Sequence, residues 1–139
     1  MELTKNKFVK ASYEESKSLL TVTWLPETAN MTGDDYKDVI NLILDFFKEY
    51  TIKNWLGDTK KFAFPIVPEL QEWFAHEINP QLIKLGLQRI AMVVPEDLIA
   101  QLAVDQALDE MDENKSEGKV ISKYFDNLED AKKWATANE

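Results

Sequence analysis

The chain contains one histidine, His76, and the carboxylate of Glu72 lies four residues before it. Residues four apart share a helix face, so this pair could move a proton or contribute to a metal site. A zinc-binding HExxH helix would need a second histidine at position 80, which is Pro80, and no cysteine is present to complete a structural zinc site. We treat Glu72 and His76 as acid–base candidates, with exposed helix residues as the alternative. We predict no metal and no cofactor.

A second candidate is the pair Asp58 and Thr59, which follows a predicted strand at residues 52–56. In open α/β sheets, ligands gather beyond the carboxyl ends of the strands. Phosphorylation of Thr59 would add about two negative charges, and Lys60 and Lys61 stand next to it to pair with them. We therefore treat Asp58 and Thr59 as a candidate regulatory turn. The alternative is an ordinary turn whose side chains bind their own backbone.

A third candidate is a set of aromatic residues around a proline-containing loop. We call it the aromatic set, and it consists of Trp55, Phe62, Phe64, Trp73 and Phe74. Such residues could line an apolar pocket for a lipid or an aromatic ligand. They could equally fill the core or form a subunit interface, where tryptophan and phenylalanine are enriched. All three interpretations stay open at this point.

Acidic residues gather between positions 105 and 117, where six carboxylates face one lysine, Lys115. A calcium loop counted from Asp112 would need a glycine at its sixth position and a glutamate at its twelfth. The glycine, Gly118, comes one residue late, and the twelfth position is Lys123. We therefore predict a solvated helix end and an acidic loop rather than an EF-hand.

The overall composition excludes several classes of function. The 139 residues include 16 Lys and Arg against 25 Asp and Glu, which gives a formal charge of -9. The chain has no cysteine, and this absence excludes a thiol nucleophile and disulfides. A negative surface disfavours nucleic acid and anionic membranes. No stretch reaches the roughly 20 apolar residues of a spanning helix. Neither a phosphate-binding glycine loop nor a GxSxG serine elbow is present. We expect a cytoplasmic protein that is not an enzyme.

The elements that must position these candidates alternate along the chain. Thr32 can cap a helix that starts at Gly33 and carries an apolar stripe from Tyr36 to Phe47. Further helices are predicted from Pro68 to about Gly86 with a kink or break at Pro80, from Pro95, and after Asn127 with Leu128 turned inward. Strands are expected at residues 8–13, 19–25, 52–56, 89–94 and 120–125, the first two forming an antiparallel hairpin. This β-β-α-β-α-β-α-β-α order predicts a single α/β domain over residues 1–139, with a mixed, mostly parallel sheet.

The same order, with particular residues at its joints, resembles the SpoIIAA-like or STAS-like fold of small bacterial proteins. The matching segments are Trp24 in the opening hairpin, Thr32–Tyr36, Leu56–Asp58, Trp73 and Asn79–Pro80 on the helix to Gly86, Arg89–Pro95, and Tyr124–Ala131 with Trp134. The resemblance implies a domain that is commonly non-enzymatic and binds a partner protein in sigma-factor control, or a lipid- or ligand-binding module. Anti-sigma antagonists carry a phosphorylated Ser or Thr in an Asp-Ser-Ser-Gly-like turn. Asp58 and Thr59 match two of its positions, but the glycine is absent.

These observations lead to three hypotheses. The first is a non-catalytic regulatory domain that binds a protein partner or its own copy. The second is a carrier of a small molecule or lipid that uses the aromatic set. The third is a hydrolase that uses carboxylates or the pair Glu72 and His76.

Overall fold

The computed structural model describes residues 1–95 and 120–137. Their six strands form one sheet in the same order as in the chain. β1 and β2 pair antiparallel, as do β2 and β3, whereas β3, β4, β5 and β6 run parallel. The strands are β1 (Glu2–Lys5), β2 (Val9–Glu14), β3 (Leu19–Trp24), β4 (Asn54–Asp58), β5 (Arg89–Val93) and β6 (Ile121–Phe125). The predicted α/β class with a mixed, mostly parallel sheet is confirmed.

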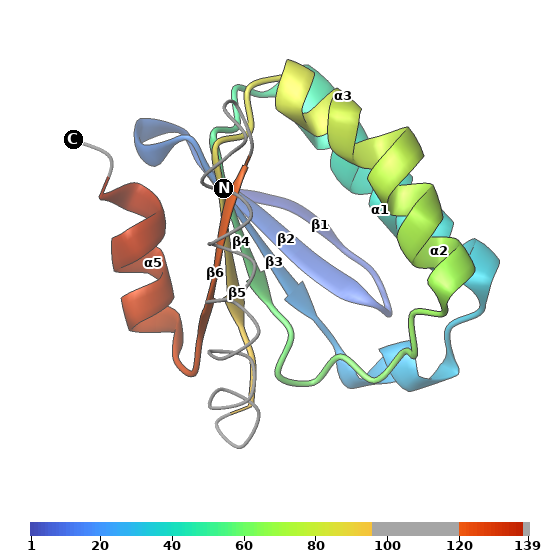
Figure 1. Cartoon of the computed structure of the whole chain (residues 1–139). Coiled ribbons are helices and arrows are strands. Elements are labelled where there is room, and N and C mark those ends of the chain that lie inside the picture. The colour runs from blue at the N-terminus through green and yellow to red at the C-terminus, as the bar shows by residue number, and fades with distance from the viewer. Residues whose placement is uncertain (96–119, 138–139) are drawn as a thin grey trace, which may run out of the picture.

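Helices cover both faces of the sheet. Among the described residues, α1 (Gly33–Glu49), α2 (Pro68–Trp73) and α3 (Asn79–Lys84) lie on one face, and α5 (Leu128–Thr136) lies on the other (Figure 1). Short 3₁₀ turns at Glu15–Lys17 and Pro26–Asn30 connect β2 to β3 and lead from β3 towards α1. We refer to the two sides as the α1 face and the α5 face.

Local sequence signals explain where α1 begins and which side it buries. The Thr32 hydroxyl accepts a hydrogen bond from the Asp35 N–H at 3.1 Å, and the Asp35 carboxylate accepts one from the Thr32 N–H at 3.0 Å. This capping box satisfies two backbone donors at the helix start. The predicted stripe is buried, including Tyr36, Ile43 and Phe47. The start and the buried face of α1 are therefore as predicted.

The helix that begins at Pro68 changes its winding before Pro80 instead of stopping. Residues Phe74–Ile78 form a π-helical turn between α2 and α3, and the Asn79 N–H donates to the Phe74 carbonyl, five residues earlier. A proline in a helix lacks a donor and crowds the carbonyl four residues before it, and a wider turn accommodates both defects. The chain then ends the helix near Gly86, whose φ of 110° is in the left-handed region, as predicted.

Three details differ from the sequence predictions. β1 was not predicted, because Glu2, Thr4 and Lys5 read as a polar start; pairing with β2 makes this segment a strand. β4 is shifted towards the carboxyl end and includes Gly57 and Asp58, whereas the sequence predicts that both follow the strand. Leu128 is 44% exposed and does not point inward. The residues of α5 that are buried against the sheet are Ala131 and Ala135.

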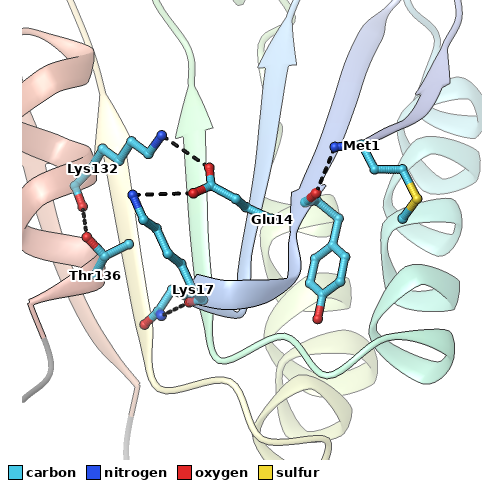
Figure 2. Close-up of polar contacts among 7 residues, drawn as sticks. Met1, Glu14, Lys17, Lys132 and Thr136 are labelled. Atoms are coloured by element: carbon cyan, nitrogen blue, oxygen red, sulfur yellow. Dashed lines mark hydrogen bonds and ion pairs between the residues drawn. The ribbon is translucent and has the colours of Figure 1, made fainter.

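A polar contact joins the β2–β3 hairpin to α5. The Glu14 carboxylate lies 3.2 Å from the Lys132 ammonium and 3.3 Å from that of Lys17 (Figure 2). The hydrogen bond to Lys132 is the main reason why the pKa of Glu14 lies below its ordinary value of 4.5. In the same region the Met1 amino group donates to the Tyr13 carbonyl at 3.0 Å. The helix predicted from Pro95 and the acidic residues 105–117 lie outside the described residues.

Candidate functional site

The α1 face contains a pocket of about 320 Å³. The sheet forms its floor, α1 and the π-helical turn form one wall, and the segment 59–67 that follows β4 forms another. The helical residues in contact with it are Tyr36, Ile40 and Phe74, and those of the loop are Thr59, Phe62 and Ile66. The sheet contributes Trp24, Trp55, Gly57, Ile90, Met92, Ser122 and Tyr124. We call this site the aromatic pocket.

The register of the parallel strands explains why these sheet residues meet. Trp55 pairs with Ile90, and Ile90 with Ser122. Two residues further on, Gly57 pairs with Met92, and Met92 with Tyr124. Because alternate residues of a strand point to the same face, both rows lie on the α1 face. The floor of the pocket is therefore two rows of three residues from β4, β5 and β6.

The loop wall is anchored by a buried threonine. Thr28 is fully buried, its hydroxyl donates to the Leu25 carbonyl at 2.8 Å, and it accepts from the Ala63 N–H at 2.9 Å. Directly before Ala63, the Phe62 ring meets the ring of Trp24 edge-to-face, with centroids 5.0 Å apart. A loop held at both its backbone and a ring has a defined position over the sheet.

Further ring contacts extend from this wall into the helices. Tyr36 stacks on Phe64 at 5.5 Å between centroids, and the ring of Trp73 approaches Tyr36 edge-on at 6.3 Å. Burial raises the pKa of Tyr36 to about 12, so its hydroxyl stays protonated at neutral pH. Phe64 and Trp73 thus support the pocket wall through Tyr36 without lining the pocket.

Trp55 holds an unsatisfied polar atom at the pocket floor. It is 7% exposed, and its indole N–H has no hydrogen-bond partner among residues 1–95 and 120–137. A buried donor without an acceptor costs about 1–3 kcal/mol. A Cβ built on Gly57 would meet no neighbouring heavy atom within 4 Å except this nitrogen, at 4.0 Å. Gly57 thus leaves open the part of the floor that adjoins the indole N–H.

The pocket is uncharged. None of its lining residues in the described part of the chain is Lys, Arg, His, Asp or Glu. Its lining residues with a polar side-chain atom are Tyr36, Trp55, Thr59, Ser122 and Tyr124. Such a lining favours an apolar body with a small number of polar atoms.

The candidate turn Asp58 and Thr59 lies at the carboxyl edge of the sheet. The Thr59 hydroxyl donates to the Val93 carbonyl at 2.7 Å and the Thr59 N–H to the same oxygen at 2.8 Å. The Asp58 carboxylate accepts from the Lys60 N–H at 3.2 Å. The turn thus ties β4 to β5, and Thr59 contributes to the pocket wall. Phosphorylation of Thr59 stays a prediction.

Glu72 and His76 lie away from the pocket. Both side chains are exposed, and neither lines the pocket. His76 lies within the π-helical turn Phe74–Ile78, which changes the spacing from Glu72 that a regular helix would give. Within residues 1–95 and 120–137, no three side chains of the types that bind metals come together.

Sequence reasoning found part of the pocket. Trp55, Phe62 and Phe74 of the aromatic set line it, whereas Phe64 and Trp73 lie behind the wall. It missed Trp24 and Tyr36, which it assigned to the hairpin and to the helix stripe, and it missed Gly57. The available signals were Tyr36, an aromatic residue in the first turn of α1, and Gly57, a glycine at the end of a predicted strand.

Comparisons with known proteins identify no relative of this chain. No protein-family model matches the chain, and neither does any curated protein or solved structure. In the described part of the chain, no helix has the length and apolar character of a membrane span.

Proposed function

We propose that this domain binds a small, mainly apolar molecule in the aromatic pocket and acts without catalysis, as a carrier or a sensor of that molecule. The supporting observation is an uncharged, aromatic-lined pocket of about 320 Å³ next to an unpartnered indole N–H. Ligand pockets commonly run from about 300 to 1,000 Å³. An apolar cavity of about 150 Å³ already binds benzene, so this one has room for a bicyclic compound or a short acyl chain.

The cost of the pocket to the apo protein supports the same proposal. Protein interiors are normally close-packed, and space left beside apolar side chains loses dispersion contacts. Glycine inside a strand is unfavourable because it loses more backbone entropy on folding than other residues and has no side chain to pack. Gly57 nevertheless lies within β4, with an open floor above it. A bound apolar ligand would recover the missing contacts.

The test is a titration with the neutral fluorescent probe N-phenyl-1-naphthylamine. We expect saturable binding to the wild type. Gly57→Val should weaken it at least tenfold, because its side chain grows into the floor. Gly57→Ala should have a smaller effect, and Gly33→Ala, the same change at a glycine outside the pocket, should have none. Absence of probe binding, or equal binding by folded Gly57→Val, would refute the proposal.

A protein-interaction function, as the SpoIIAA-like resemblance implies, is the second proposal. β6 is the last strand in the sheet order, and Ile121 on it is 56% exposed. An apolar side chain on an edge strand is a feature of strand-mediated association. We propose a second copy of this chain as the partner. Light scattering over a concentration series tests it: a dimer that Ile121→Lys converts to monomer supports it, and a wild-type monomer throughout rejects it.

A further inference from the structure

We infer that the ligand presents a neutral hydrogen-bond acceptor, such as a ketone, aldehyde or ester carbonyl, to the indole N–H of Trp55. This inference rests on the proposed function and narrows its ligand class. The juxtaposition of Trp55 with the open floor over Gly57 carries it.

The indole N–H is the group that selects for an acceptor. Among the described residues, Trp55 Nε1 is the one buried side-chain nitrogen or oxygen without a hydrogen bond. An indole N–H can only donate, so its complement must be an acceptor. The residue is 7% exposed, and its ring meets that of Phe47 edge-on, with centroids 5.9 Å apart. The donor is thus fixed in place before any ligand arrives.

Space for an acceptor exists next to the donor. The Cβ position on Gly57 is empty and lies 4.0 Å from Nε1, and Gly57 lines the pocket together with Trp55. The nitrogen itself is closed to solvent in the ligand-free protein, so an oxygen of a ligand that rests on Gly57 reaches the usual 2.7–3.2 Å or so when neighbouring side chains yield slightly. Any side chain at position 57 would occupy this approach.

The charge of the surroundings selects a neutral acceptor. In the part of the chain that the structure describes, no basic side chain lines the pocket, and the whole chain has a formal charge of -9. A carboxylate placed against Trp55 would lose its hydration without gaining a cation, which is costly in an apolar site. A carbonyl of a ketone, aldehyde or ester accepts the same hydrogen bond without that penalty.

Three probes with one carbon skeleton test the inference. They are 1-tetralone, which has a ketone, tetralin, which has no acceptor, and tetralin-1-carboxylate, which is charged. Displacement of N-phenyl-1-naphthylamine gives their affinities. We expect 1-tetralone to bind at least tenfold more tightly than tetralin and than the carboxylate.

The substitution Trp55→Phe keeps an aromatic ring and removes the donor. It should reduce the preference for 1-tetralone over tetralin to less than about threefold, while Trp24→Phe, the same change at another lining tryptophan, should retain the preference. If Trp55→Phe does not fold, the indole N–H resonances of the wild type decide. One of the four should move downfield with 1-tetralone and stay in place with tetralin.

The outcomes separate this inference from the proposed function. If 1-tetralone and tetralin displace N-phenyl-1-naphthylamine equally well, the pocket still binds apolar molecules, but the inference that its ligand presents an acceptor is wrong. A preference for the ketone that survives in Trp55→Phe also overturns it, because another donor is then responsible. Failure of every probe, including the fluorescent one, refutes the proposed function itself.

Discussion

The two faces of the sheet are packed in opposite ways. On the α5 face, small residues of the helix, Ala131 and Ala135, lie fully buried against Leu56, Ala91 and Val93. On the α1 face, large rings cover the sheet and the pocket of about 320 Å³ remains between them and the strands. One sheet therefore carries a closed layer on one side and an open one on the other.

The difference follows from side-chain size. Alanines let a helix approach a sheet closely, and the aliphatic residues below then fill the remaining space. Aromatic rings are rigid and prefer edge-to-face or offset contacts, as between Trp24 and Phe62. Such rings build walls that stand away from the sheet, and at Gly57 the floor has no side chain to fill the gap. The α1 face thus contains both the larger buried cluster and the site, whereas the α5 face is a smaller, filled layer.

The largest expected effect is a truncation on the closed face. Leu56→Ala, at a residue 1% exposed, should lower the free energy of unfolding by about 2–5 kcal/mol, because it leaves a cavity in a filled layer. Met92→Ala, which enlarges the pocket, should cost clearly less, since Met92 is only half-buried. Urea unfolding followed by circular dichroism measures both. Equal losses would show that the α1 face is as closely packed as the α5 face.

The reverse experiment adds volume to each face. Ala131→Leu should destabilise the protein by about 1–3 kcal/mol, because Ala131 is fully buried and the layer has no room. Gly57→Val should instead stabilise it by roughly 0.5–1 kcal/mol, since a β-branched residue favours a strand and the space beside Gly57 is open. Opposite signs in thermal unfolding support the comparison. A loss of stability in both variants contradicts it.

The closed layer and the helices were largely predictable, because their signals are local. The capping pair Thr32 and Asp35 lies three residues apart, and the stripe of α1 repeats within single turns. Asn127 accepts a hydrogen bond from the Asp130 N–H at 2.8 Å, as expected for the cap of α5. β1 escaped prediction, since nothing in its own residues distinguishes it from a polar terminus and its pairing with β2 defines it.

The pocket was only partly predictable, because it depends on register. Trp55 and Ile90 lie 35 positions apart in the chain and become neighbours through parallel pairing of β4 with β5. No local sequence pattern predicts which residues of β4 and β5 pair. The aromatic residues near one another in the chain, such as Phe62 and Phe74, could be grouped by composition. Gly57 could not be, because its importance lies in the space above it.

A smaller effect is expected where the loop wall is anchored. Thr28→Val keeps the shape of the buried side chain but removes the oxygen that accepts from the Ala63 N–H. We expect a loss of about 1–2 kcal/mol, since the buried hydroxyl also donates to the Leu25 carbonyl and both hydrogen bonds are lost. The affinity for N-phenyl-1-naphthylamine should fall as well, because Phe62 follows the loop. Thr51→Val, at an exposed threonine outside the pocket, is the control. Unchanged probe affinity in Thr28→Val would show that the wall holds without this anchor.

The smallest expected effect concerns the polar contact between the hairpin and α5. The pKa of Glu14 is lowered in the folded protein, chiefly by its hydrogen bond to Lys132. Its contribution is therefore fully present above the unfolded pKa, ordinarily 4.5, and is lost as the pH falls through the lower folded value. Because the Glu14 side chain is 42% exposed, solvent screens the pair, and Glu14→Gln should cost only about 0.2–1 kcal/mol at pH 7.

The same substitution distinguishes the polar contact from the apolar layer beneath it. The stability difference between wild type and Glu14→Gln should shrink as the pH falls below 4.5 and should shrink with added salt. The loss caused by Leu56→Ala should change little under either condition, because it arises from packing. Chemical unfolding at pH 7 and pH 3, each at low and high salt, gives both differences. A Glu14→Gln effect that is independent of pH and salt would show that the lost stability does not come from the charge of the carboxylate.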